Sequence, residues 1–91
     1  MSRIFDKMEE VVVWTNAYST DDIGKHLARL RGARGLHQDE LADRLGVSRA
    51  TISSMENGGA VSVQLVVRAM SVLGSRVVIA PKDATVIVTE A

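Results

Sequence analysis

The chain has 91 residues with 11 basic and 11 acidic side chains, so its formal net charge is zero. Apolar residues make up 46% but aromatic residues only 3%, which predicts one small domain with an aliphatic core. The absence of cysteine excludes a disulfide framework, a thiolate zinc site and a cysteine nucleophile. No apolar run approaches the ~20 residues of a membrane-spanning helix and no signal-peptide pattern opens the chain, so we expect a cytoplasmic protein without a membrane partner.

Residues 1–19 form an N-terminal extension whose structure is ambiguous. Ile4, Met8 and Val11 have helical spacing, whereas the run from Val11 to Trp14 prefers a strand. We expect a helix that frays into an extended stretch. Trp14 is expected to anchor a core or an interface.

A first well-defined helix is expected to begin near Thr20 or Asp21. Ser19 and Thr20 are possible caps, and the acidic pair Asp21 and Asp22 complements the helix dipole. Its apolar stripe comprises Ile23, Leu27 and Leu30. Gly32 and Gly35 should end it, and His26 is expected on its polar side.

Residues 38–57 predict two short helices joined by a tight turn. The first covers residues 38–45, and Gly46 follows it where a helix needs a residue that reaches positive φ. Ser48 can cap the second helix, residues 49–56, whose buried side carries Ile52 and Met55. Ala42 is small, as the close crossing of two helices requires.

A fourth helix is expected from the Ser62 cap to about Leu73, and it is apolar almost all round. One face would carry Val63, Val66, Val67, Met70 and Leu73, and a second face would carry Leu65, Ala69 and Val72. So small a domain has too little chain to cover both faces. Either a second subunit or the terminal segments of the same chain should cover the second face.

Residues 76–91 change to a β pattern. The runs RVVIA (76–80) and TVIVT (85–89) are β-branched and are joined by Pro-Lys-Asp-Ala, which predicts a hairpin or two short strands. Because a lone hairpin is marginal in water, we expect pairing with a second chain. The predicted dimer interface comprises Leu65, Ala69, Val72, Val77, Val78 and Ile79.

The layout of residues 38–58, including the closing Met55-Glu56-Asn57-Gly58, resembles the Cro/repressor-like (Xre-type) helix-turn-helix family. The alternative is an ordinary helical hairpin with a glycine turn. The resemblance implies a mainly α, lambda-repressor-like domain of four to five helices over residues 20–75. The segment after it resembles HipB-like antitoxins, in which a C-terminal strand pairs across the dimer axis. That resemblance does not account for the run TVIVT (85–89), which has no counterpart in the family pattern.

The second helix of the motif should read DNA in the major groove. Rotation by about 100° per residue turns Ile52 and Met55 inward. The residues left for base contacts, also by family resemblance, are Ser48, Arg49, Ala50, Ser53 and Ser54. Arg49 is the main candidate for specificity, because a guanidinium can donate two hydrogen bonds to guanine. The alternative for Arg49 is a phosphate contact or a surface salt bridge.

A second group should hold the DNA backbone: Gln38, Thr51, Asn57, Arg34 and Arg44. The matching Gln of the family contacts phosphate at the N-terminus of its helix. Residues 23–55 carry six basic groups against three acidic ones, so the basic excess falls on the motif. Glu56 is expected to bond within the protein.

These features predict a homodimeric repressor of a near-palindromic operator. The alternative is an antitoxin that regulates its own operon and neutralises a toxin protein, such as a HipA-like kinase. Catalysis is not expected, because His26 and His37 belong to no triad or metal-ligand pattern. We expect neither a cofactor nor a metal ion.

Overall fold

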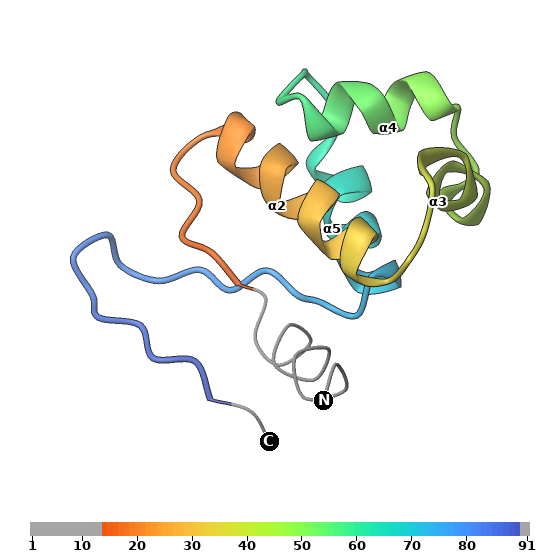
Figure 1. Ribbon diagram of the computed structural model, residues 1–91. Helices are drawn as coiled ribbons and strands as arrows, with labels where there is room; N and C mark the ends of the chain where they lie inside the picture. The colour runs from red at the N-terminus through yellow and green to blue at the C-terminus, as the bar shows by residue number, and fades with distance from the viewer. Residues whose placement is uncertain (1–13, 90–91) are drawn as a thin grey trace, which may run out of the picture.

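The computed structural model describes residues 14–89, in which four helices follow one another. They are α2 (Thr20–Ala33), α3 (Gln38–Leu45), α4 (Arg49–Glu56) and α5 (Val63–Val72). Figure 1 shows α4 passing over one end of the bundle, with α3 seen nearly end-on beside it. Helix α4 packs against both α2 and α3, and α5 packs against α3. The four predicted helices are confirmed to within about one residue at each end.

Serine side chains start three of these helices. The caps of α4 and α5 are as predicted, and at α2 the cap is Ser19 rather than the alternative Thr20. In each case the serine Oγ accepts a hydrogen bond of 3.1–3.2 Å from the backbone N–H three residues later. The three serines are Ser19, Ser48 and Ser62. Helix α3 begins differently, because the His37 N–H donates to Glu40 Oε1 at 2.7 Å. Local chemistry therefore sets where each helix begins.

The core is aliphatic, and each helix supplies a large side chain with at most 1% of its surface exposed. These are Leu27 of α2, Leu41 of α3, Ile52 of α4 and Leu73 at the end of α5. Ala42, Leu45 and Met55 complete the core around the motif. The buried face of α4 is thereby fixed, as the helical rotation predicted.

Helices α2 and α4 approach most closely at Gly24. A Cβ placed on Gly24 would lie 2.5 Å from the Glu56 carbonyl oxygen and 2.6 Å from that of Met55. Only a residue without a side chain permits this approach. Gly24 therefore sets how closely the C-terminal end of α4 packs on α2.

The predicted faces of α5 are wrong for two residues of the proposed dimer interface. Leu65 and Ala69 are 9% and 0% exposed and belong to the core of their own chain. Val63 and Val67, expected inside, are instead 77% and 47% exposed. Because α5 is apolar on nearly every side, its periodicity does not determine which side faces α3.

His26 is also placed differently from the prediction. It is 7% exposed, and its Nδ1 makes no hydrogen bond in the described structure. Burial, helped by the nearby charge of Arg29, lowers the pKa of His26 below its ordinary value. Burial therefore favours the neutral form of the imidazole.

Residues 75–89 form an extended arm that leaves the helices and turns back on itself (Figure 1). The Ala84 N–H donates to the Pro81 carbonyl at 3.0 Å, which closes the turn between RVVIA and TVIVT. No strand is found in residues 14–89, so the predicted strand or hairpin is not confirmed. A two-stranded ladder on its own gains too little stability in water to form reliably.

Most of the predicted N-terminal helix, residues 3–13, lies outside the described residues. Trp14 lies within them and is 39% exposed, which leaves its expected anchoring role a prediction. Across residues 14–89, no helix is long and apolar enough to cross a membrane.

Candidate nucleic-acid interface

A short, sharply bent connection orients α4 against α3. Gly46 adopts φ 71° and ψ 33°, the left-handed conformation that glycine reaches without steric cost. The Val47 N–H then donates to the Ala42 carbonyl at 3.0 Å, and the half-buried Val47 side chain packs against the core. Ser48 caps α4 immediately afterwards. The predicted turn is confirmed, and it leaves the N-terminal end of α4 projecting from the domain.

The predicted base-reading residues divide between the two halves of α4. Ser48, Arg49 and Ala50 are all exposed at its N-terminal end. Ser53 is half-buried, and its carbonyl accepts a hydrogen bond of 2.8 Å from Asn57 Nδ2. Ser54 is exposed, but its Oγ lies against Gly59, where a Cβ would collide with it. The first turn of α4 is therefore the part of the helix where all of the predicted base-reading residues are exposed.

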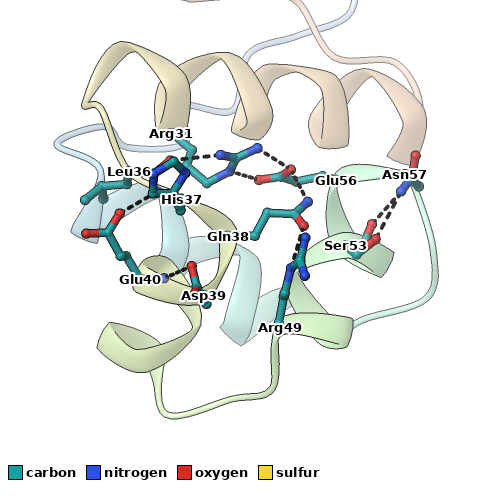
Figure 2. A network of polar contacts seen from close by, with 10 residues as sticks. All are labelled: Arg31, Leu36, His37, Gln38, Asp39, Glu40, Arg49, Ser53, Glu56 and Asn57. Carbon is teal, nitrogen blue, oxygen red and sulfur yellow. Dashed lines mark hydrogen bonds and ion pairs between the residues drawn. The ribbon is translucent and has the colours of Figure 1, made fainter.

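A continuous set of polar contacts joins three helices behind this surface (Figure 2). Arg31 of α2 binds the Glu56 carboxylate through two nitrogens, with Nε–Oε2 at 2.6 Å and Nη2–Oε1 at 3.0 Å. Gln38 of α3 donates from Nε2 to the same carboxylate at 3.0 Å. Arg49 Nε in turn donates to Gln38 Oε1 at 3.3 Å. The exposed arginine of α4 is thus linked, through Gln38, to a half-buried ion pair.

The ion pair removes the negative charge of Glu56 from the outer surface. The Glu56 side chain is 7% exposed and that of Arg31 is 19% exposed. The hydrogen bond from Arg31 to Glu56 raises the pKa of Arg31, although partial burial opposes this effect. Arg31 also donates to the Leu36 carbonyl at 2.8 Å. Glu56 bonds within the protein as expected, but the sequence did not identify Arg31, 25 positions away, as its partner.

Gln38 does not simply stand free at the start of α3. It is half-buried, and both ends of its amide are engaged by Glu56 and Arg49. The adjoining backbone donors are also occupied, because the N–H groups of His37 and Glu40 bond to the side chains of Glu40 and Asp39. An open polar cleft forms here, lined by Arg31, His37, Gln38, Asp39 and Arg49. Asp39 was not predicted to line a site.

The other predicted backbone contacts lie in separate places. Thr51 is half-buried, and its Oγ1 lies 3.0 Å from Ser48 Oγ at the start of α4. Asn57 is exposed at the opposite end of this helix. Arg34 donates to the Leu73 carbonyl at 3.0 Å, which ties the end of α2 to the end of α5. Arg44 is exposed near the end of α3. The structure therefore assigns Arg34 an internal bond rather than a position beside α4.

Two of the six basic side chains of residues 23–55, those of Arg31 and Arg34, make hydrogen bonds to a carboxylate or a backbone carbonyl of the domain. Arg44 and Arg49 remain exposed on the two helices of the motif. Within residues 14–89, no three His, Asp or Glu side chains gather into a candidate metal site.

Comparison with known proteins agrees with this geometry. Residues 27–78, more than half of the chain, match the Helix-turn-helix family, and the matched segment spans α3, the glycine turn and α4. No curated protein matches the chain. The chain belongs to the Cro/C1-type helix-turn-helix family of DNA-binding transcriptional regulators.

Proposed function

We propose that this regulator is a homodimeric repressor that reads a near-palindromic operator with α4. The observation that carries this proposal is the exposed first turn of α4, where Arg49 is held by Gln38 beside uncharged, accessible neighbours. A helix presented in this way fits the major groove, which is wide enough to admit it. We propose no catalytic activity for this protein.

Arg49 is proposed to supply most of the base specificity. Its guanidinium can donate two parallel hydrogen bonds to guanine O6 and N7, which discriminates by ~1–3 kcal/mol. The bond to Gln38 uses only Nε, so the terminal nitrogens stay available to DNA. Ala50 offers a methyl group to thymine, and Ser48 can donate or accept. Ser53 and Ser54 would contribute less, because both lie near the end of the helix beside Asn57 or Gly59.

Contacts with the DNA backbone are assigned to Gln38, Thr51, Asn57 and Arg44. Gln38 would contact a phosphate while keeping its bonds to Glu56 and Arg49, since its amide lies between these two residues at the edge of the polar cleft. Arg44 supplies charge, which the salt dependence of binding should report. Arg34 is left out of this group because its guanidinium lies at the end of α5, against Leu73 and Gly74, rather than beside α4.

Dimerisation is proposed because one helix reads too few base pairs for selective regulation. Two copies of α4 would lie roughly 34–36 Å apart, one turn of the double helix. The apolar residues available for such an interface are exposed on the outer side of α5 and in the first half of the arm. They are Val63, Val67, Val72, Val77, Val78 and Ile79, and the second half of the arm adds Val86, Ile87 and Val88.

A selection from a random double-stranded DNA library tests this function. Wild-type protein should enrich a near-palindromic site whose half-sites are about one helical turn apart. A variant that ends at Ser75 keeps all four helices but lacks the arm, and it should bind the same site more weakly. If the full chain enriches no common sequence, the proposal fails. If the truncated variant binds with unchanged affinity and stoichiometry, the arm has no part in dimerisation on the operator.

An antitoxin is the second candidate, in which the same chain also neutralises a toxin protein. The observation that favours it is a pair of aromatic side chains before α2, Trp14 and Tyr18, which are 39% and 74% exposed. Exposed aromatic residues are enriched at protein interfaces. Co-expression with the product of an adjacent gene tests this candidate. A toxin that co-purifies with wild type but not with a Trp14→Ala, Tyr18→Ala variant would support it, whereas equal recovery with both would count against it.

A further inference from the structure

The last described segment of the arm, residues 85–89, is exposed, uncharged and composed only of threonine, valine and isoleucine. We propose that this run pairs antiparallel with the same run of a second copy, with Ile87 on the two-fold axis. The inference deepens the homodimer of the proposed function and rests on it. It adds that the two-fold axis of the dimer passes between the two copies of Ile87.

The order of the side chains in this run is symmetric, because T-V-I-V-T reads the same in both directions. An antiparallel pair centred on Ile87 therefore places like opposite like throughout. Thr85 faces the partner's Thr89, Val86 faces the partner's Val88, and Ile87 faces the partner's Ile87. Thr–Thr and β-branched pairs are favourable directly across antiparallel strands. The isologous contact of a two-fold dimer requires this kind of self-complementarity.

The other β-branched run lacks this symmetry. RVVIA centred on Val78 would place Arg76 opposite the partner's Ala80, a charged side chain against a methyl group. The run around Ile87 also contains no charged residue that would select an oppositely charged partner. A second copy is therefore the occupant that best matches residues 85–89.

The backbone of residues 85–89 is available for pairing. Within the described chain none of its N–H or C=O groups takes part in a backbone hydrogen bond, and the turn bond from Ala84 is the last before it. Exposure alternates along the run, with Val86 at 40%, Ile87 at 81% and Val88 at 43%. This period of two is that of a strand with one face partly covered. An exposed β-branched edge is a surface that proteins normally pair or cover.

The turn at Pro81 would also allow residues 76–80 to pair with residues 85–89 of the same chain without preventing the pairing between two copies. If 76–80 lay along one edge of 85–89, the other edge would still be free for the second copy. Four short strands would then form one sheet across the axis, which is enough strands for independent stability when one face is covered.

Single cysteines test the register, because the natural chain has none. Directly opposed residues have Cα atoms about 4.5–5.5 Å apart, within the range of about 4.4–6.8 Å that a disulfide accepts. Ile87→Cys should therefore link most of the protein into covalent dimers in a glutathione redox buffer. Val86→Cys and Val88→Cys should each fail alone, since their diagonal separation of about 7–8 Å is too long. An equal mixture of these two variants should link.

Asp43→Cys is the control for disulfides that form by random collision, because residue 43 is exposed and lies on α3 rather than in the arm. Ile79→Cys, at a position that is 93% exposed, lies in the other half of the proposed interface and reports pairing about another axis. All of these positions are exposed, and thermal melting of the reduced variants will check that each domain is folded. As a second variant, Ile87→Lys places two like charges face to face and should weaken the dimer by roughly tenfold relative to Ile87→Thr.

The outcomes separate this inference from the function on which it rests. If the chain sediments as a dimer but Ile87→Cys links no faster than Val86→Cys or Asp43→Cys, the pairing is refuted and the dimer stands. If the chain is monomeric while bound to its operator, both the pairing and the dimer fail. If Ile87→Cys links as expected and no DNA sequence is enriched, the pairing stands and the operator-binding proposal fails.

Discussion

The contact between α2 and α4 at Gly24 gives the sharpest test of how the reading helix is held. In Gly24→Ala the new methyl would lie 2.5 Å from the Glu56 carbonyl oxygen, nearly an ångström short of the ordinary 3.4 Å. Both neighbouring atoms belong to the backbone of α4 and cannot rotate away. Overpacking of this kind costs ~2–3 kcal/mol, and the helix propensity of alanine recovers ~1 kcal/mol. We expect a net destabilisation of ~1–2 kcal/mol.

Gly32→Ala is the matched control, since Gly32 lies in the same helix and a Cβ placed on it would meet nothing within 4 Å. It should stabilise the protein by up to ~1 kcal/mol, so the two variants should have opposite signs. Calorimetry should show Gly24→Ala melting roughly 5–15 °C lower and Gly32→Ala melting higher. If Gly24→Ala melts at or above the wild-type temperature, the close approach of α2 and α4 is not as described.

Three further predictions concern caps, charge and protonation. Ser48→Ala removes the cap of α4 and should cost ~1 kcal/mol in chemical denaturation, whereas Ser48→Asn should retain most of the stability. Glu56→Ala leaves the half-buried Arg31 without its carboxylate and should cost ~2–3 kcal/mol, of which Glu56→Gln should recover part; equal stability of wild type and Glu56→Ala would contradict the ion pair. Because burial lowers the folded pKa of His26, the unfolded chain takes up a proton first as the pH falls through 6.5. Wild type should therefore lose stability more steeply than His26→Leu as the pH falls below about 6.5, and parallel curves would exclude this effect.

The sequence predicted the elements whose signals are local. Serine hydroxyls stand where α2, α4 and α5 begin, and Gly46 stands where α3 must end, so the boundaries followed from neighbouring residues. The strong contrast between apolar and polar residues in α4 likewise placed Ile52 and Met55 inside.

The features that the sequence missed depend on how distant segments meet. The partner of Glu56 lies 25 positions earlier, and only the crossing of α2 with α4 brings Arg31 to it. The face of α5 was misassigned because Val63 and Leu65 are equally suited to a core, and contact with α3 decides between them. The arm has a β pattern, yet no strand is found in residues 14–89, because a local pattern does not determine whether a segment finds a strand to pair with.

The measurement that tests DNA reading by α4 most directly is the ratio of specific to non-specific DNA affinity for Arg49→Ala and Arg44→Ala, at about 50 and 200 mM salt. Arg49→Ala should reduce this ratio by roughly tenfold to a hundredfold and relax the preference at one position of each half-site. Arg44→Ala should weaken both affinities alike and lower the salt dependence by about one counterion per contact. If Arg49→Ala lowers both affinities equally and leaves the ratio unchanged, Arg49 contacts only phosphate and α4 does not read the sequence through it.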